Sequence, residues 1–209
     1  MRVVSYQKCW FYSKKDVTQA VKHILNTGLV LKEFNKTFIA LIPKNDNPEK
    51  VSEFRLISLC NVIMRITTKC IANRVKKVMN STSQNAFIPG RHISDNILIA
   101  HELIHHISHN KGRKSRRMAI KIDMQKAYDR VNWNFLRQVL IVTSFSDKWV
   151  NLIMNRVTKV SYEILVNGTP FQAFDPRGGL RQGDPLSLYL FVLCMNVLLY
   201  NLDKAQDGI

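Results

Sequence analysis

Acidic residues are scarce in this chain, where 15 Asp and Glu stand against 31 Lys and Arg and leave a net charge of +16. The imbalance is uneven, because residues 1–120 hold 21 basic and 7 acidic side chains while residues 121–209 hold 10 and 8. A basic field of this size attracts polyanions, of which nucleic acid phosphate is the commonest and an anionic membrane surface is the weaker alternative. Net charge alone does not choose between them.

Cysteine is also rare, and the four residues present, Cys9, Cys60, Cys70 and Cys194, form no Cys-x-x-Cys pair. We therefore expect no disulfide framework, and we expect reduced, packed thiols in an intracellular protein. A signal-peptide pattern is missing because lysines interrupt every early apolar run. The longest apolar run, 186–202, falls short of the usual membrane-spanning length and contains polar residues, which predicts a buried helix and no membrane partner.

With 46% apolar residues, the chain can fill a sizeable core as one large domain or two small ones. Apolar spacing predicts helices over 15–29, 62–79, 95–107, 131–140 and 149–157, with Asp129 or Asn132 capping the fourth. It predicts strands over 37–42 and 54–59, and Asn167-Gly168 indicates a hairpin joining 162–166 to 169–174. The fold class is therefore α+β.

The stretch 118–123 alternates apolar and polar residues, which predicts a strand closed by Asp123. A carboxylate at the mouth of an apolar strand requires a cation, hydrogen-bond donors or water, so Asp123 is a candidate functional residue. The alternative is that Asp123 only ends the strand and begins a turn.

Two further places hold candidate binding residues. Lys44 follows a strand and Arg55 stands alone among apolar residues, so each is either a phosphate contact or a solvated surface charge. The glycine-rich loop 177–185 leads into an apolar helix with Asp184 as N-cap. It either lays Arg181 and Gln182 against a base, sugar or phosphate, or is only a tight turn.

The basic helix over 62–79 either tracks a nucleic acid backbone or presents a solvated face, and the run 111–117 is expected to be an exposed basic loop after the turn-rich stretch 84–91. Within 95–107, His101-Glu102-Leu103-Ile104-His105 fits the His-Glu-x-x-His pattern of zinc peptidases. The third ligand of the extended motif is not at its spacing, so a half-exposed helix face is the preferred interpretation.

Five motifs carry a resemblance that spacing alone does not supply: TFIALIPK, FRLISLCNV, QNAFIPGRHISDNILIAHELIH, IKIDMQKAYDRVNWNFL and GGLRQGDPLSLYLF. In this order they closely resemble the reverse transcriptase of plant LINE-type non-LTR retrotransposons. The resemblance implies an RNA-directed DNA polymerase with a right-hand architecture. Residues 1–117 would form the fingers with an N-terminal extension, and residues 118–209 would form a partial palm with an incomplete sheet.

The resemblance also implies roles for individual residues. Asp123 matches the aspartate that binds catalytic Mg²⁺, and Tyr128 matches the aromatic steric gate that excludes a ribose 2′-hydroxyl. Gln182 and Gly183 match the loop that lines the template and the incoming dNTP, while Lys44 and Arg55 resemble the residues that hold the triphosphate. The implied partners are an RNA template, a DNA primer and dNTPs, and the implied location is the nucleus.

The same resemblance exposes departures. The family takes its other metal-binding carboxylates from an Asp-Asp hairpin that follows the last motif, and this sequence contains no Asp-Asp pair. Leu56 and Leu188 stand where the family usually has proline, and Gly178 stands where it has arginine. We therefore expect a truncated fragment that does not polymerise DNA by itself and is poorly soluble. The alternatives are a basic nucleic acid binding fragment without catalysis and, third, a zinc hydrolase at His101, Glu102 and His105.

Overall fold

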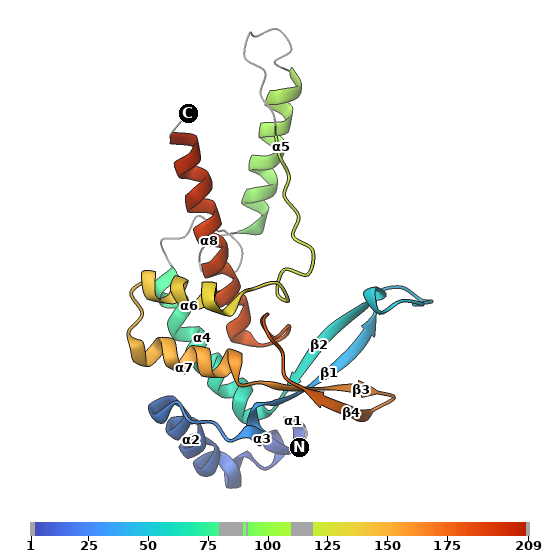
Figure 1. Ribbon diagram of the computed structural model, residues 1–209, viewed down its shortest axis with the longest axis vertical. Helices are drawn as coiled ribbons and strands as arrows, with labels where there is room; N and C mark the ends of the chain where they lie inside the picture. Colours follow the sequence, from blue (N-terminus) through green and yellow to red (C-terminus); the bar gives the residue numbers. More distant parts are fainter. Residues whose placement is uncertain (1–2, 80–89, 91, 110–118, 208–209) are drawn as a thin grey trace.

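The computed structural model describes residues 3–79, 90, 92–109 and 119–207. One mixed sheet extends to one side of a group of helices (Figure 1). The elements follow the order α1 (Val3–Lys8), α2 (Trp10–Thr27), α3 (Lys32–Asn35), β1 (Lys36–Pro43), a 3-10 turn (Val51–Glu53), β2 (Phe54–Cys60), α4 (Val62–Val78), α5 (Ile93–His109), α6 (Trp133–Val142), α7 (Asp147–Thr158), β3 (Ser161–Val166), β4 (Thr169–Phe174) and α8 (Pro185–Asp207). The predicted stretches 84–91, apart from Gly90, and 111–117 lie outside the described residues.

The sheet has the strand order β2-β1-β3-β4. β1 pairs antiparallel with β2 and parallel with β3, and β3 pairs antiparallel with β4. Both predicted strands of the first pair and the β3–β4 hairpin are confirmed. Asn167 (φ 51°) and Gly168 (φ 81°) adopt the left-handed conformation that a two-residue hairpin turn requires.

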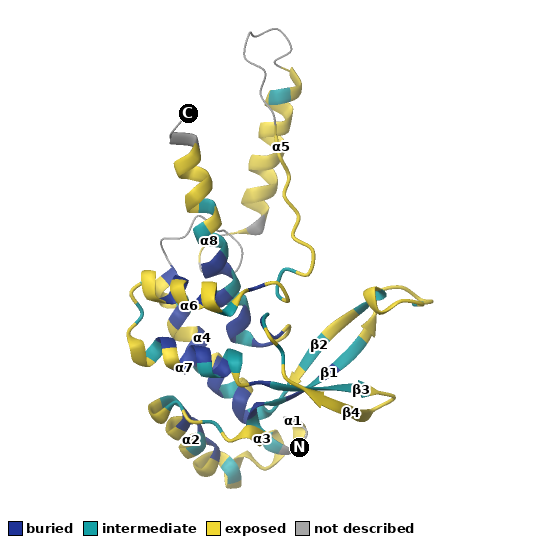
Figure 2. Ribbon diagram, in the orientation of Figure 1, coloured by how far each residue is buried: buried dark blue, intermediate teal, exposed yellow. Residues whose placement is uncertain are grey.

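The main core lies between α4, α6, α7 and α8, which Figure 2 shows as the dark blue centre of the helical part. Its fully buried side chains include Ile71, Leu136, Leu140, Ile153 and Leu190. A second cluster joins α2 to α4 through Val17, Val21, Ile24 and Ile63. The predicted helix over 15–29 is thus confirmed, although it begins earlier, at Trp10, and ends at Gly28, whose φ of 73° suits a C-cap.

The prediction that the whole run 186–202 is buried holds only for its first part. Leu186, Leu190 and Val192 are buried, whereas Leu198 and Leu202 are 39 and 47% exposed. Of the helices in the described residues, α8 is the one long and apolar enough to cross a membrane, and this is a matter of length and composition only. Its buried first half is typical of a core helix.

The strand predicted over 118–123 is wrong for the part that the structure describes. Residues 119–124 have no regular structure, and Ile120 and Ile122 are 73 and 64% exposed. A segment with alternating apolar residues forms a strand only where a neighbouring strand pairs with its backbone. The four strands in the described residues pair with one another and not with this segment. The helix expected over 95–107 does form, but α5 projects from the body, and its described side chains are exposed except that of Ile107, which is intermediate (Figure 2).

Two smaller expectations also need correction, and the predicted cap of the fourth helix is confirmed for Asn132, one of its two candidates. Cys9 is exposed and therefore not a packed thiol, although all four cysteines are free. Val78 lies in the helix that apolar spacing predicts over 62–79, but it is 56% exposed, whereas Val75 and Met79 are buried. The cap of α6 is Asn132, whose side-chain oxygen accepts from the backbone N–H of Asn134 and Phe135, and Asp129 lies in the preceding turn.

Candidate functional site

The glycine-rich loop 178–183 lies against the turn that contains Tyr128. The backbone N–H of Leu180 donates to the carbonyl oxygen of Tyr128 at 2.9 Å, and that of Gly179 donates to the carbonyl of Val131 at 2.8 Å. In return, the indole Nε1 of Trp133 donates to the carbonyl of Gly179 at 2.8 Å. Three hydrogen bonds from two directions therefore fix the loop to this turn.

Gly179 is required at this contact for two separate reasons. Its φ is +86°, a conformation that is costly for residues with a Cβ atom. A Cβ atom at this position would also lie 3.1 Å from the backbone Cα and carbonyl oxygen of Asp129. Because backbone atoms cannot move aside as a flexible side chain can, the loop and the turn approach this closely only with glycine.

The far end of the same loop is attached to β2. The backbone N–H of Ser58 donates to the carbonyl of Gln182 at 2.9 Å, and Gly183 (φ +101°) follows close to the Ser58 carbonyl. The Gln182 side chain is exposed, so its amide group faces solvent beside β2. The structure thus brings Gln182 and Gly183 to the sheet and leaves one amide available to a ligand.

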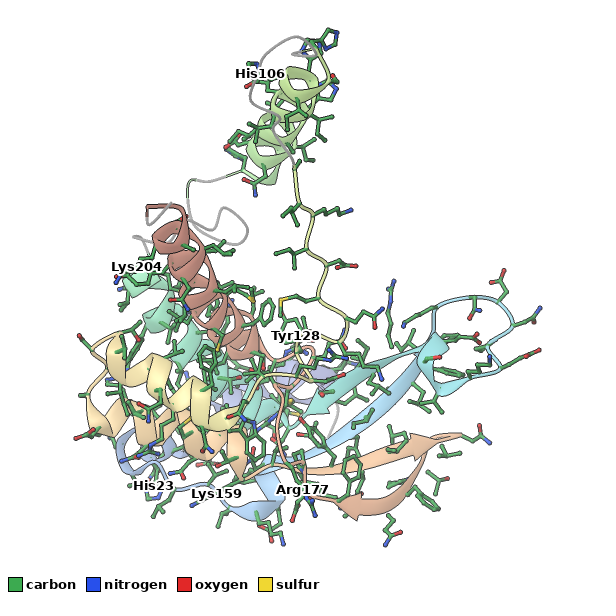
Figure 3. All side chains as sticks on the ribbon, turned by 45° about the horizontal axis from the view of Figure 1, so that its top comes forward. His23, His106, Tyr128, Lys159, Arg177 and Lys204 are labelled. Atoms are coloured by element: carbon green, nitrogen blue, oxygen red, sulfur yellow. The ribbon has the colours of Figure 1, made fainter. Side chains whose placement is uncertain are left out.

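Tyr128 is half-buried at the base of α8 (Figure 3). Its ring stacks on that of Phe191, with 5.1 Å between the centroids and 22° between the planes. Burial raises the pKa of the Tyr128 phenol, so the group is neutral at physiological pH. Packing on α8 therefore sets the orientation of this ring before any ligand arrives.

Asp123 lies in the unpaired segment 119–124 and is exposed. A carboxylate at the end of a buried strand would need a cation or hydrogen-bond donors, but the exposed Asp123 carboxylate can be solvated by water instead. The described residues contain no group of three or more His, Cys, Asp or Glu side chains that could hold a metal ion. Because Mg²⁺ takes near-octahedral oxygen ligands, usually from several groups, Asp123 by itself does not form such a site.

Lys44 and Arg55 lie on the outer half of the β1–β2 hairpin. The Lys44 Nζ donates to the carbonyl of Ser52 at 2.7 Å, so the ammonium group is held within its own hairpin. Arg55 is exposed and opposite Ile42, three residues before Ser58 on β2. At about 3.3 Å per residue, Arg55 is about 10 Å along the strand from the Gln182 contact.

Arg181 does not lie where a base or phosphate could reach it. It is 5% exposed, and its guanidinium donates to the Asn35 side-chain oxygen at 2.5 Å and to the carbonyl of Arg156. This contact corrects the expectation that Arg181 contacts a ligand. The buried Arg181 side chain instead connects the loop to α3 and α7 through these hydrogen bonds.

Arg156 is the residue that the sequence interpretation missed. It is 2% exposed, and its Nε and Nη1 atoms have no hydrogen-bond partner among the described residues. Burial and the neighbouring charge of Arg181 lower the pKa of Arg156 to about 10, while the charge of Asp184 acts in the opposite direction. A signal did exist: Arg156 follows Leu152 and Ile153 by four and three residues, which places it on the buried face of α7.

The His-Glu-x-x-His stretch lies on exposed α5. The rings of His105 and His109 stack with 3.9 Å between centroids, and His109 Nδ1 is 3.0 Å from the carbonyl of His105. His101 and Glu102 are exposed, and no metal-holding group of three occurs among the described residues. The arrangement is that of a solvated helix face.

Comparison with known proteins identifies the family. The reverse transcriptase (RNA-dependent DNA polymerase) family matches residues 42–208. The transposon TX1 uncharacterized 149 kDa protein of Xenopus laevis is 25% identical over 208 residues, which cover 98% of this chain and 16% of that protein. The Pol polyprotein from type-2 retrotransposable element R2DM of Drosophila melanogaster is 28% identical over 162 residues, which cover 77% of this chain and 15% of the polyprotein.

A shorter match is 51% identical over 43 residues to an uncharacterized mitochondrial protein of Arabidopsis thaliana, covering 21% of this chain and 35% of that protein. The chain spans less than a fifth of the length of the TX1 and R2DM relatives. The family match covers residues 42–208, which include the main core between α4, α6, α7 and α8 but not α2, which contributes to the second cluster. The chain belongs to the reverse transcriptase family, and it resembles the RNA-directed DNA polymerases of non-LTR retrotransposons.

Proposed function

We propose that this chain forms part of the nucleotidyl-transfer site of a non-LTR retrotransposon reverse transcriptase, which extends a DNA primer on an RNA template with dNTPs. The observation that carries the proposal is the double attachment of the loop 178–183. Its first part is hydrogen-bonded to the Tyr128 turn and its last part to Ser58 of β2, with the Gln182 amide exposed between them. A loop that is fixed at both ends and exposes one amide, hydrogen-bonded to a turn whose aromatic ring packs on α8, suits the positioning of a flat base pair.

The proposed roles follow the sequence motifs. Tyr128 is the ring that a ribose 2′-hydroxyl would meet, and Gln182 and Gly183 line the template and the incoming nucleotide. Lys44 and Arg55 are the proposed triphosphate contacts, which requires the Lys44 ammonium group to leave the Ser52 carbonyl. We also propose the division into fingers, 1–117, and partial palm, 118–209.

Reverse transcriptases generally use a divalent metal, and we propose Mg²⁺ with Asp123 as one ligand. One exposed carboxylate does not complete a Mg²⁺ shell, and the described residues contain no group of three or more His, Cys, Asp or Glu side chains that could hold a metal ion. We propose that this chain is a fragment and that the other carboxylates belong to a segment beyond these 209 residues. We further propose that the element is of the plant LINE type and that its polymerase acts in the nucleus.

Primer extension tests the proposal. The chain alone, and the chain joined to the Asp-Asp hairpin and thumb of an intact relative, are incubated with an RNA template, a DNA primer, Mg²⁺ and dNTPs. We expect incorporation only with the joined protein, and we expect Asp123→Asn to abolish it. Asp175→Asn, which neutralises another exposed aspartate, is the matched control and should leave the rate unchanged.

Two results would contradict the proposal. Extension by the chain alone would show that the additional carboxylates are unnecessary. Extension by the joined protein that survives Asp123→Asn would show that Asp123 is not a metal ligand.

A non-catalytic nucleic acid binding fragment is the second candidate, because the basic charge concentrates in residues 1–120 while a metal-holding acidic group is missing from the described residues. Its mark is RNA or DNA affinity that falls steeply with salt and survives Asp123→Asn. No observation favours the zinc hydrolase.

A further inference from the structure

The last turn of α5 carries two stacked imidazole rings. His105 and His109 are four residues apart, so their side chains lie on the same face of the helix. Their ring centroids are 3.9 Å apart, with 26° between the ring planes, and both residues are exposed. The same end of α5 carries His106, which is labelled in Figure 3. The stacked rings belong to neither buried cluster, and ions and water reach them from solvent.

The hydrogen bonds around His109 fix the position of its ring proton. Its Nδ1 atom lies 3.0 Å from the carbonyl oxygen of His105, which can only accept, so Nδ1 carries the hydrogen. The Ser108 hydroxyl agrees with this assignment, because its Oγ donates to the same carbonyl at 2.9 Å and accepts from Nδ1 at 3.1 Å. In the neutral ring the lone pair is then on Nε2. Metal-ligating histidines are commonly held in this way, with one ring N–H bonded to a backbone carbonyl and the other nitrogen on the metal.

Two stacked imidazoles one helical turn apart can chelate a single ion. Zn–N distances are about 2.0–2.1 Å, so two neighbouring nitrogen ligands of one ion lie about 3 Å apart. Rings whose centroids are 3.9 Å apart reach this separation when their ligating edges tilt towards each other. Two histidines at positions i and i+4 of a helix also supply two of the ligands in known zinc sites, so the spacing itself suits a metal.

From these observations we infer that His105 and His109 form a two-ligand site for one divalent transition-metal ion. His109 ligates through Nε2, His105 contributes one ring nitrogen, and water completes the coordination shell on this exposed face. Imidazole suits Cu²⁺, Ni²⁺ and Zn²⁺, whereas Mg²⁺ prefers oxygen ligands. The bound ion links two residues one turn apart and thereby stabilises the end of α5.

This site differs from the two metal sites considered above. The zinc hydrolase pattern uses His101, Glu102 and His105, whereas the stacked pair begins at His105 and extends one turn further. The pair contains no carboxylate that could act as a general base, so we expect binding without hydrolysis. It also contains no Asp123, which makes its occupancy independent of the proposed polymerase function. Two protein ligands agree with the finding that the described residues hold no metal-binding group of three.

The test is isothermal titration of the untagged chain with NiCl₂, in a Cys9→Ser background so that the exposed thiol does not compete for the ion. We expect about one Ni²⁺ per chain. His109→Ala should weaken binding at least about tenfold, which is the low end of the loss seen when even an outer-shell group of a metal site is removed. His105→Ala should have the same effect, because a chelate requires both rings, and excess Mg²⁺ should not displace the Ni²⁺.

Two matched controls each remove one exposed imidazole. His23→Ala removes a histidine of α2, labelled in Figure 3, and His101→Ala removes the histidine one turn before the pair. Both variants should bind Ni²⁺ within twofold of the original chain. Equal losses in His23→Ala and His109→Ala would indicate binding to histidines in general, and a tenfold loss in His101→Ala would place the ion at the His-Glu-x-x-His stretch. Either result, or unchanged binding by His109→Ala, would overturn the inference.

A second measurement reports on the helix itself. Saturating Ni²⁺ should slow amide hydrogen exchange over residues 105–109 in the original chain but not in His109→Ala, because only a bridging ion restrains this turn. Unchanged exchange in the original chain would mean that the ion does not link the two rings, which would contradict the proposed chelate. Asp123→Asn should bind Ni²⁺ as the original chain does, so failure of the polymerase proposal leaves this site testable.

Discussion

Replacing Gly179 with alanine should destabilise this protein more than the loss of a flexible residue explains. The new methyl group would meet two penalties at once: a φ of +86° and backbone atoms of Asp129 at 3.1 Å. Gly168 offers a matched comparison within the same fold, because its φ is +81° but a Cβ atom there would have no heavy atom within 4 Å.

The conformational penalty is common to both positions and amounts to about 1–2 kcal/mol. Gly168→Ala should therefore lower the free energy of unfolding by about that amount. Gly179→Ala adds the cost of forcing a methyl group against a backbone, about 1–3 kcal/mol, because relief requires the Tyr128–Leu180 and Val131–Gly179 hydrogen bonds to lengthen. We expect a total of about 2–5 kcal/mol at Gly179.

Urea unfolding of the two variants, followed by circular dichroism and tryptophan fluorescence, measures this difference. Trp133 adds a local reading, since its indole N–H bonds to the Gly179 carbonyl and its emission should shift if the loop moves. If both variants lose the same free energy, or if Gly168→Ala loses more, the close approach of the loop to Asp129 does not constrain the fold and the reasoning is wrong.

Three further predictions concern buried or capping groups. Burial raises the pKa of Tyr162 to about 12, above its ordinary value near 10, so its stabilising contribution is complete below pH 10 and is lost towards pH 12. Tyr162→Phe should therefore remove about 2–3 kcal/mol of the alkaline decrease in unfolding free energy, and an unchanged pH dependence would contradict this. Arg156→Met removes a buried charge, two of whose nitrogens have no hydrogen-bond partner among the described residues. Thermal unfolding should therefore show a melting temperature equal to or above that of the original chain. A decrease of more than about 2 kcal/mol in the free energy of unfolding would mean that the guanidinium is well paired. Asn132→Ala should lower the free energy of unfolding, measured in urea, by about 0.5–2 kcal/mol, because two N–H groups of α6 lose their acceptor. The control Asn134→Ala, at an exposed position in the same turn, should lower it by less than about 0.5 kcal/mol. Equal losses in the two variants would argue against the cap.

Elements specified by local chemistry were predictable from the sequence. Asn167-Gly168 demands a two-residue turn, and Gly28 ends α2 in the left-handed conformation. Asp184 caps α8, with its carboxylate accepting from the Leu186 N–H at 3.0 Å. Each of these depends on residues within a few positions of one another, so spacing alone carries the information.

Features that depend on distant partners were not predictable in this way. The segment that contains Asp123 alternates like a strand, but alternation does not reveal whether a neighbouring strand is present. For the loop of Arg181 the sequence left open a ligand contact or a tight turn, and it could not show that the Arg181 guanidinium contacts Asn35, 146 positions away. The candidate site was found by its motif residues, while Arg156, which supports it from below, carries no motif.

Because β1 pairs in parallel with β3, the sheet can be completed only after β3 has been synthesised, long after β1. About 120 residues separate Pro43 from Ser161, so at about 5–20 residues per second β1 precedes β3 by about 6–24 s. Throughout that interval one edge of β1 has no strand to pair with, and the apolar side chain of Ile39 has no β3 beside it. A chaperone that holds extended apolar segments, or an unwanted contact with another nascent chain, would therefore act on β1 before the sheet can close.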